Sequence, residues 1–130
     1  MKKQIIIPAL LSIVLVGLLL IPLDGTANNT FVFFIGRFHP IILHLPIGGL
    51  AALFVMEIIN SYRPQLNLDS ACSILLWFSV ATVIPSAILG FILASSGNYD
   101  DELLNLHKWL GWLTALVCVW LLYFKLKSKK

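Results

Sequence analysis

The chain has 130 residues, of which 59% are hydrophobic and only 12% are charged, with a formal net charge of +3. A soluble domain carries about 25% charged residues, so this chain has too few to cover a surface that faces water. The basic excess lies at the two ends of the sequence, which excludes a nucleic-acid-binding module that works through a charged face. The composition therefore predicts an integral membrane protein whose first partner is the lipid bilayer.

Four apolar runs follow in chain order, and each is long enough to cross about 30 Å of hydrocarbon as a helix. None alternates with a period of two, which favours helices over the strands of a barrel. The sequence thus predicts an all-α integral membrane protein, a bundle of four transmembrane helices that makes one domain of residues 1–130. The predicted helices are Ile5–Leu23, Phe38–Ile59, Ala71–Ser95 and Leu103–Leu126.

The distribution of Lys and Arg predicts how the bundle is oriented. Seven of these residues lie on one side of it and two on the other, so both termini are expected to be cytoplasmic. The 24–37 and 96–106 connections are then expected to be loops on the outward, periplasmic side. The seven are Lys2, Lys3, Arg63, Lys125, Lys127, Lys129 and Lys130, and the two are Arg37 and Lys108.

The first run also fits a signal peptide cleaved after Ala27, because two lysines precede it and small residues follow it. Its 19 apolar residues exceed the usual hydrophobic region of about 7–15, which favours a retained helix. Cleavage would leave three helices with the same orientation. The chain contains no Cys-x-x-Cys-His motif, so no covalently attached c-type haem is expected.

The three histidines all lie on the expected outward side. His39 and His44 open the second run, and His107 lies near the start of the fourth. At about 1.5 Å per residue, His44 lies about 9 Å and His107 about 6 Å inside its helix. Ionisable groups at that depth are costly and tend to face a bundle interior or cavity. We therefore predict that His44 and His107 converge.

Small residues follow each of these two histidines at helical spacing. Gly48 comes four residues after His44, and Gly111 comes four residues after His107, so each glycine shares a face with its histidine. Gly90 belongs to a similar stripe on the third run. Together they predict a flat slot for a porphyrin held by two neutral imidazoles.

Two cations are expected to complete such a site. Arg37 and Lys108 are the two basic residues on this side, and each lies next to or near a histidine in sequence. They are placed where haem propionates would accept charge-assisted hydrogen bonds. The candidate cofactor-binding residues are therefore His44, His107, His39, Arg37, Lys108, Gly48, Gly111 and Gly90.

Two other interpretations of the same residues remain open. Stripes of small residues are also the ordinary means of close helix crossing in membranes, with no cofactor, and histidines can simply bond between helices. A copper or zinc site would use His39, His44 and His107 together. His39 and His44 lie about 140° apart around a regular helix, so this site requires the chain to be irregular near Pro40 and Pro46.

The segment Gly36-Arg-Phe-His-Pro-Ile-Ile-Leu-His-Leu-Pro-Ile-Gly resembles a bacterial membrane-protein family of unknown function, typified by His-Pro followed by His-x-Pro. The family also occurs as the membrane module of planctomycete-type cytochrome c proteins. The resemblance continues at Ser96-Gly-Asn-Tyr-Asp and Leu106-His-Lys-Trp-Leu-Gly and covers about residues 34–125. It implies a bacterial inner-membrane location near respiratory c-type cytochromes, and haem binding.

Fused members of that family continue into a further helix bearing Gly-His-x-Gly-Gly and Thr-His-Gly, neither of which occurs in this sequence. If those histidines belong to the family's site, a second copy of the chain or a partner subunit would supply the remaining ligands. The leading hypothesis is a non-covalent haem b electron-transfer module, or its anchor, that serves a periplasmic c-type cytochrome. The alternatives are a structural or interaction subunit without cofactor and a copper or zinc protein; no nucleophile–base pair is apparent, so catalysis by this chain alone is not expected.

Overall fold

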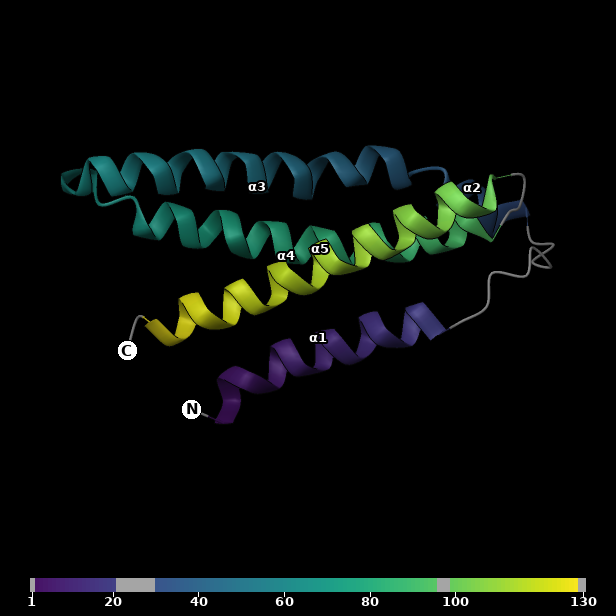
Figure 1. Ribbon diagram of the computed structural model, residues 1–130, viewed down its shortest axis with the longest axis horizontal. Coiled ribbons are helices and arrows are strands. Elements are labelled where there is room, and N and C mark those ends of the chain that lie inside the picture. Colours follow the sequence, from purple (N-terminus) through teal and green to yellow (C-terminus); the bar gives the residue numbers. More distant parts are fainter. Residues whose placement is uncertain (1, 21–29, 96–98, 129–130) are drawn as a thin grey trace.

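The computed structural model describes residues 2–20, 30–95 and 99–128, and all regular structure in these residues is helical, with no strand. One helix precedes the first gap, and the remaining helices follow in a compact up-and-down order (Figure 1). Their bounds are α1 Lys2–Leu20, α2 Thr30–Gly36, α3 His39–Tyr62, the 3₁₀ helix η1 Pro64–Leu66, α4 Asp69–Ala94 and α5 Asp101–Ser128.

Three segments in the described part of the chain are long and apolar enough to cross a membrane, namely Thr30–Tyr62, Asp69–Ala94 and Asp101–Ser128. The first joins α2 and α3. The run predicted as the first of four spans forms α1, whose apolar stretch, Ile5–Gly17, is shorter than these three. The end of that predicted span and the cleavage site after Ala27 lie outside the described residues.

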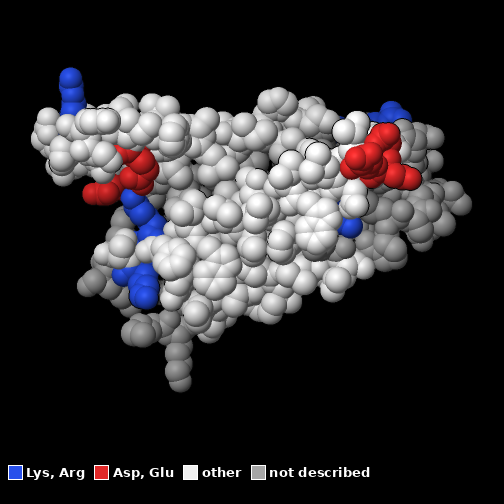
Figure 2. Space-filling model, viewed as in Figure 1, with Lys and Arg blue, Asp and Glu red and all other residues white. Residues whose placement is uncertain are grey.

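The molecular surface is that of a protein surrounded by lipid. Large apolar side chains are exposed along every long helix; examples are Ile13 of α1, Phe54 of α3, Ile74 of α4 and Leu110 of α5. Figure 2 shows the charged side chains gathered at the two ends, with a broad uncharged band between them. We call the end with His39 and His107 the histidine end, and the end with Lys125 the opposite end.

The structure corrects the expected loop over residues 24–37. Residues 30–36 form α2, and a turn at Arg37 and Phe38 separates it from α3. Gly36 is buried against α4, where an added Cβ would lie 3.0 Å from both Ile92 Cγ2 and the backbone nitrogen of Leu93. The apolar sequence Thr-Phe-Val-Phe-Phe-Ile-Gly therefore extends the helical layer by packing on the end of α4.

The core lies along α4, which α3 contacts on one side and α5 on the other, while α1 packs mainly on α5 (Figure 1). The buried cluster contains residues from α1, α4 and α5: Leu15, Leu76, Val80, Val83, Ala115, Cys118, Val119 and Leu122. On the α3 side, Gly49 meets Phe78 and Ser79, and an added Cβ would lie 2.5 Å from Ser79 Oγ. Close backbone approach at Gly49 thus fixes which face of α3 meets α4.

Candidate functional site

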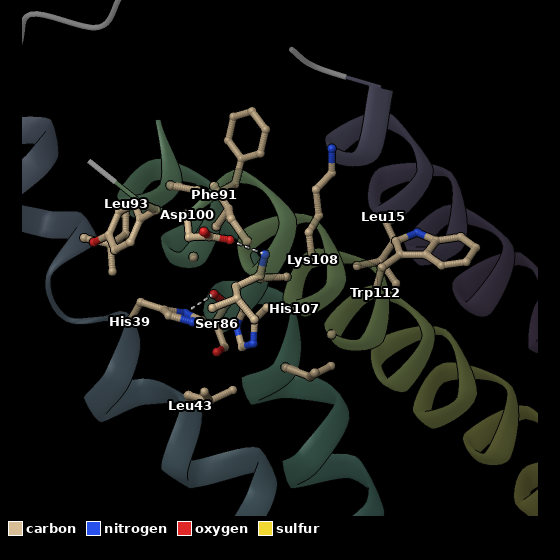
Figure 3. A pocket seen from close by; sticks show the side chains of 18 residues that line it. Leu15, His39, Leu43, Ser86, Phe91, Leu93, Asp100, His107, Lys108 and Trp112 are labelled. Carbon is tan, nitrogen blue, oxygen red and sulfur yellow. Dashed lines mark hydrogen bonds between the residues drawn. The ribbon is translucent and has the colours of Figure 1, made fainter. Parts of the chain in front are cut away.

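A cavity of about 460 Å³ opens at the histidine end, bounded by α1, α3, α4 and α5 (Figure 3). Its walls are mostly apolar, and its polar lining includes His39 of α3, Ser86 of α4, and His107 and Trp112 of α5. A volume of this size lies in the range of about 300–1,000 Å³ that small-molecule and cofactor sites occupy. The three long helices and α1 therefore enclose a space suited to one ligand.

His39 is the first residue of α3, with Pro40 next to it in the first turn, where a missing N–H costs no helical hydrogen bond. Its Nδ1 lies 2.8 Å from the backbone oxygen of Ser86. Since a carbonyl oxygen only accepts, Nδ1–H donates this bond, and Nε2 keeps its lone pair. Metal-ligating histidines commonly have their second nitrogen held in this way.

The His39 ring lies directly on Gly90 of α4. A Cβ added at Gly90 would lie 2.8 Å from Cε1, 3.0 Å from Nδ1 and 3.2 Å from Nε2 of that ring. Real Cβ atoms essentially never approach other atoms within 3.0 Å. Glycine at position 90 is therefore what allows the imidazole to lie flat against α4 while bonding to Ser86 one turn earlier.

His107 of α5 faces His39 across the same space (Figure 3). The ring centroids are 6.3 Å apart and the ring planes make an angle of 82°. Two imidazoles on opposite sides of one metal ion have centroids about 6.4 Å apart, because the metal–nitrogen bond is about 2.0 Å and the nitrogen lies about 1.2 Å from the ring centre. A direct N–H···N bond of about 2.9 Å would bring the centroids about 1 Å closer.

His44 lies elsewhere. It is exposed on α3, its Nδ1 pairs with the backbone oxygen of Pro40 in the same helix, and it does not line the cavity. Five residues after His39, its side chain leaves the helix about 140° away. The structure thus brings His39, rather than His44, to His107, and it corrects the expected convergence of His44 with His107.

The other expected site residues divide in the same way. Gly90, Gly111 and Lys108 line the cavity. Gly48 lies on the exposed face of α3 with His44, where an added Cβ would meet nothing within 4 Å, and Arg37 is exposed in the turn before α3. Across residues 2–20, 30–95 and 99–128, His, Cys, Asp and Glu side chains form no group of three or more that could hold a metal ion, so the three histidines do not assemble into one site.

Two polar atoms of the cavity wall are left without a partner among the described residues. Ser86 Oγ and Trp112 Nε1 are buried and make no hydrogen bond there, although Ser86 as a whole is only 1% exposed. The sequence analysis did not single out Trp112, which lines the cavity. The spacing of Lys108, Trp112 and Ala115 at i, i+4 and i+7 was the signal that these residues share the inward face of α5.

No family model, no curated protein and no solved structure matches the chain.

Proposed function

We propose that the chain binds haem b non-covalently at the histidine end, where His39 and His107 would hold its iron. The separation of 6.3 Å between the two ring centroids carries the proposal, because it leaves room for one metal ion between two imidazoles. The hydrogen bond from His39 Nδ1 to Ser86 supports it by leaving Nε2 available as a ligand. Bound haem would supply one-electron transfer.

The apolar lining of the cavity supports the proposal of a mostly apolar guest. Its wall is mostly apolar, and Gly90 leaves room on α4 for the His39 ring. Gly111 of α5 also lines the cavity. Ser86 Oγ and Trp112 Nε1 offer hydrogen bonds that no described residue takes up. Lys108 lines the cavity and would pair with a propionate, whereas Arg37 is exposed and does not line the cavity.

The same proposal includes the cellular setting. The excess of Lys and Arg at the termini and in the 60–70 segment supports cytoplasmic termini and a histidine end that faces the periplasm of a bacterial inner membrane. An electron carrier at that end would exchange electrons with a c-type cytochrome or with a second membrane subunit. The resemblance of residues 34–125 to the membrane module of cytochrome c proteins supports this choice of partner.

The test is a hemin titration of detergent-purified protein followed by absorption spectroscopy. We expect one equivalent to bind with the spectrum of a six-coordinate, low-spin haem. His39→Ala and His107→Ala should abolish that spectrum, while His44→Ala, a matched change on the same helix as His39, should keep it. No Soret shift in the wild type, or equal loss in all three variants, would refute the proposal.

A structural role without cofactor is the second candidate, and one observation favours it. His39 bonds α3 to α4 through the Ser86 carbonyl, and the two imidazoles also fit the range of about 4.5–7 Å for edge-to-face ring pairs. In that case the histidines would hold three helices together for assembly with a partner. His39→Ala would then lower the thermal stability, by about 1 kcal/mol for a lost interhelical bond, and added hemin would change nothing.

A further inference from the structure

Two contacts join α3 to α5 even though α4 packs between them. At the histidine end the rings of His39 and His107 meet, as described above. At the opposite end, Lys125 Nζ donates a hydrogen bond of 2.7 Å to Glu57 Oε1. α3 and α5 run in the same direction, antiparallel to α4 (Figure 1). The two contacts therefore lie at opposite ends of this pair of helices.

The spacing of the two contacts is the same on both helices. Glu57 follows His39 by 18 residues, and Lys125 follows His107 by 18 residues. At 3.6 residues per turn this is five full turns, or about 27 Å, so each helix presents both of its contact residues on one face. If α5 lies against α3 so that Glu57 meets Lys125, the same alignment therefore also brings His107 to His39.

Such a device adds to the packing of α3 and α5 on α4, which also constrains how the two helices sit. Lipid is as apolar as the helix surface, so no hydrophobic force selects one register over its neighbour. A slip of α5 by one residue would move His107 about 1.5 Å along the axis and turn it by about 100°. That slip would remove His107 from His39 altogether.

The ion pair is anchored well enough to define the register. The Lys125 side chain is 21% exposed and the Glu57 side chain 43%, and Asp69 Oδ1 at the start of α4 lies 3.7 Å from Lys125 Nζ. Asn60 of α3 bonds twice to the start of α4, since its Nδ2 donates to Asp69 Oδ1 and its Oδ1 accepts from the Leu68 N–H. Lys125 thus meets acceptors held on two helices.

We infer that Glu57 and Lys125 are positioning residues for the two imidazoles: their ion pair sets the register of α5 on α3 that brings His107 opposite His39. The inference rests on the proposed function only for its spectroscopic readout, since the position of the helix ends can be measured without haem. Neither residue touches the cavity, so both act at a distance of about five helical turns.

The experiment compares Lys125→Met and Glu57→Gln, which break the pair, with the conservative Lys125→Arg. Lys127→Met is the matched control, because Lys127 is an exposed lysine two residues further along α5. Spin labels on cysteines introduced at exposed Phe38 and Leu106 report the distance between the starts of α3 and α5 by pulsed electron resonance. The native cysteines are buried, which leaves the introduced ones to react.

We expect one narrow distance distribution in the wild type, Lys125→Arg and Lys127→Met, and a broadened or shifted one in Lys125→Met and Glu57→Gln. Hemin affinity should fall about fivefold in the two breaking variants, with partial loss of the low-spin spectrum, and recover in Lys125→Arg. Unchanged distances in both breaking variants would overturn the inference. A wild type that binds no hemin would refute the proposed function instead, and the distances would still decide the role of the ion pair.

Discussion

Gly90→Ala tests whether hemin binding depends on the position of the His39 ring rather than on the stability of the bundle. The new Cβ would lie 2.8 Å from His39 Cε1, and ordinary contact begins at 3.4 Å, so the ring must retreat by about 0.6 Å. The bond of 2.8 Å from Nδ1 to the Ser86 oxygen would lengthen by a similar amount, beyond the range of about 2.7–3.2 Å for a good N–H···O bond.

The energies separate stability from function in this variant. Weakening the interhelical hydrogen bond costs about 1 kcal/mol, and replacing glycine by alanine inside a helix returns about 1 kcal/mol. The melting temperature should therefore change little. A ligand nitrogen displaced by about 0.6 Å should nevertheless weaken hemin binding by about tenfold or more, since each 1.4 kcal/mol is a factor of ten.

The assay combines a hemin titration, a thermal melt and ¹⁵N NMR of the His39 ring. Gly48→Ala is the control, because a Cβ at Gly48 meets nothing within 4 Å on the exposed face of α3. The reasoning is refuted if Gly90→Ala binds hemin as tightly as Gly48→Ala and keeps the Nδ1–H signal of His39. It is also refuted if Gly90→Ala unfolds the protein, since the loss would then be structural.

Two further changes probe the packing and the cavity wall. Gly49→Ala should destabilise the bundle by about 1–3 kcal/mol in a thermal or denaturant melt, because its Cβ would lie 2.5 Å from Ser79 Oγ. The control Gly48→Ala should be neutral or stabilising. Equal stabilities of the two variants would contradict the α3–α4 contact at Gly49. Ser86→Ala should leave the melting temperature of the hemin-free protein unchanged or raise it, since the buried hydroxyl has no partner among the described residues. A large fall in the melting temperature would mean that the hydroxyl is hydrogen-bonded.

The long helices could be predicted from sequence, because apolar runs of this length with few charges are typical of transmembrane helices. Three of the predicted runs correspond to α3, α4 and α5 within a few residues at each end. The helix α2 was missed, because a run of seven residues is too short for periodicity to separate a helix from a loop. Its helicity depends on contact between Gly36 and α4, which only the fold supplies.

The predicted histidine pair differs from the observed one in a single residue, because the rotation of α3 about its axis could not be predicted. Matched depth singled out His107, which lines the cavity, but depth alone does not say which face of α3 turns inward. Gly48 and Gly49 are adjacent, about 100° apart, and either could have met α4. The structure uses Gly49, which turns His39 inward and leaves His44 and Gly48 on the exposed face.

The most direct test of the haem proposal is the electron paramagnetic resonance spectrum of the hemin-loaded wild-type protein. If the two rings hold the iron at the angle of 82° that their planes make in the structure, ferric haem should give a highly anisotropic low-spin signal with a large maximum g value. We predict that signal in the wild type and in His44→Ala. A high-spin signal, or a low-spin signal that survives in His39→Ala, would contradict axial ligation by His39 and His107.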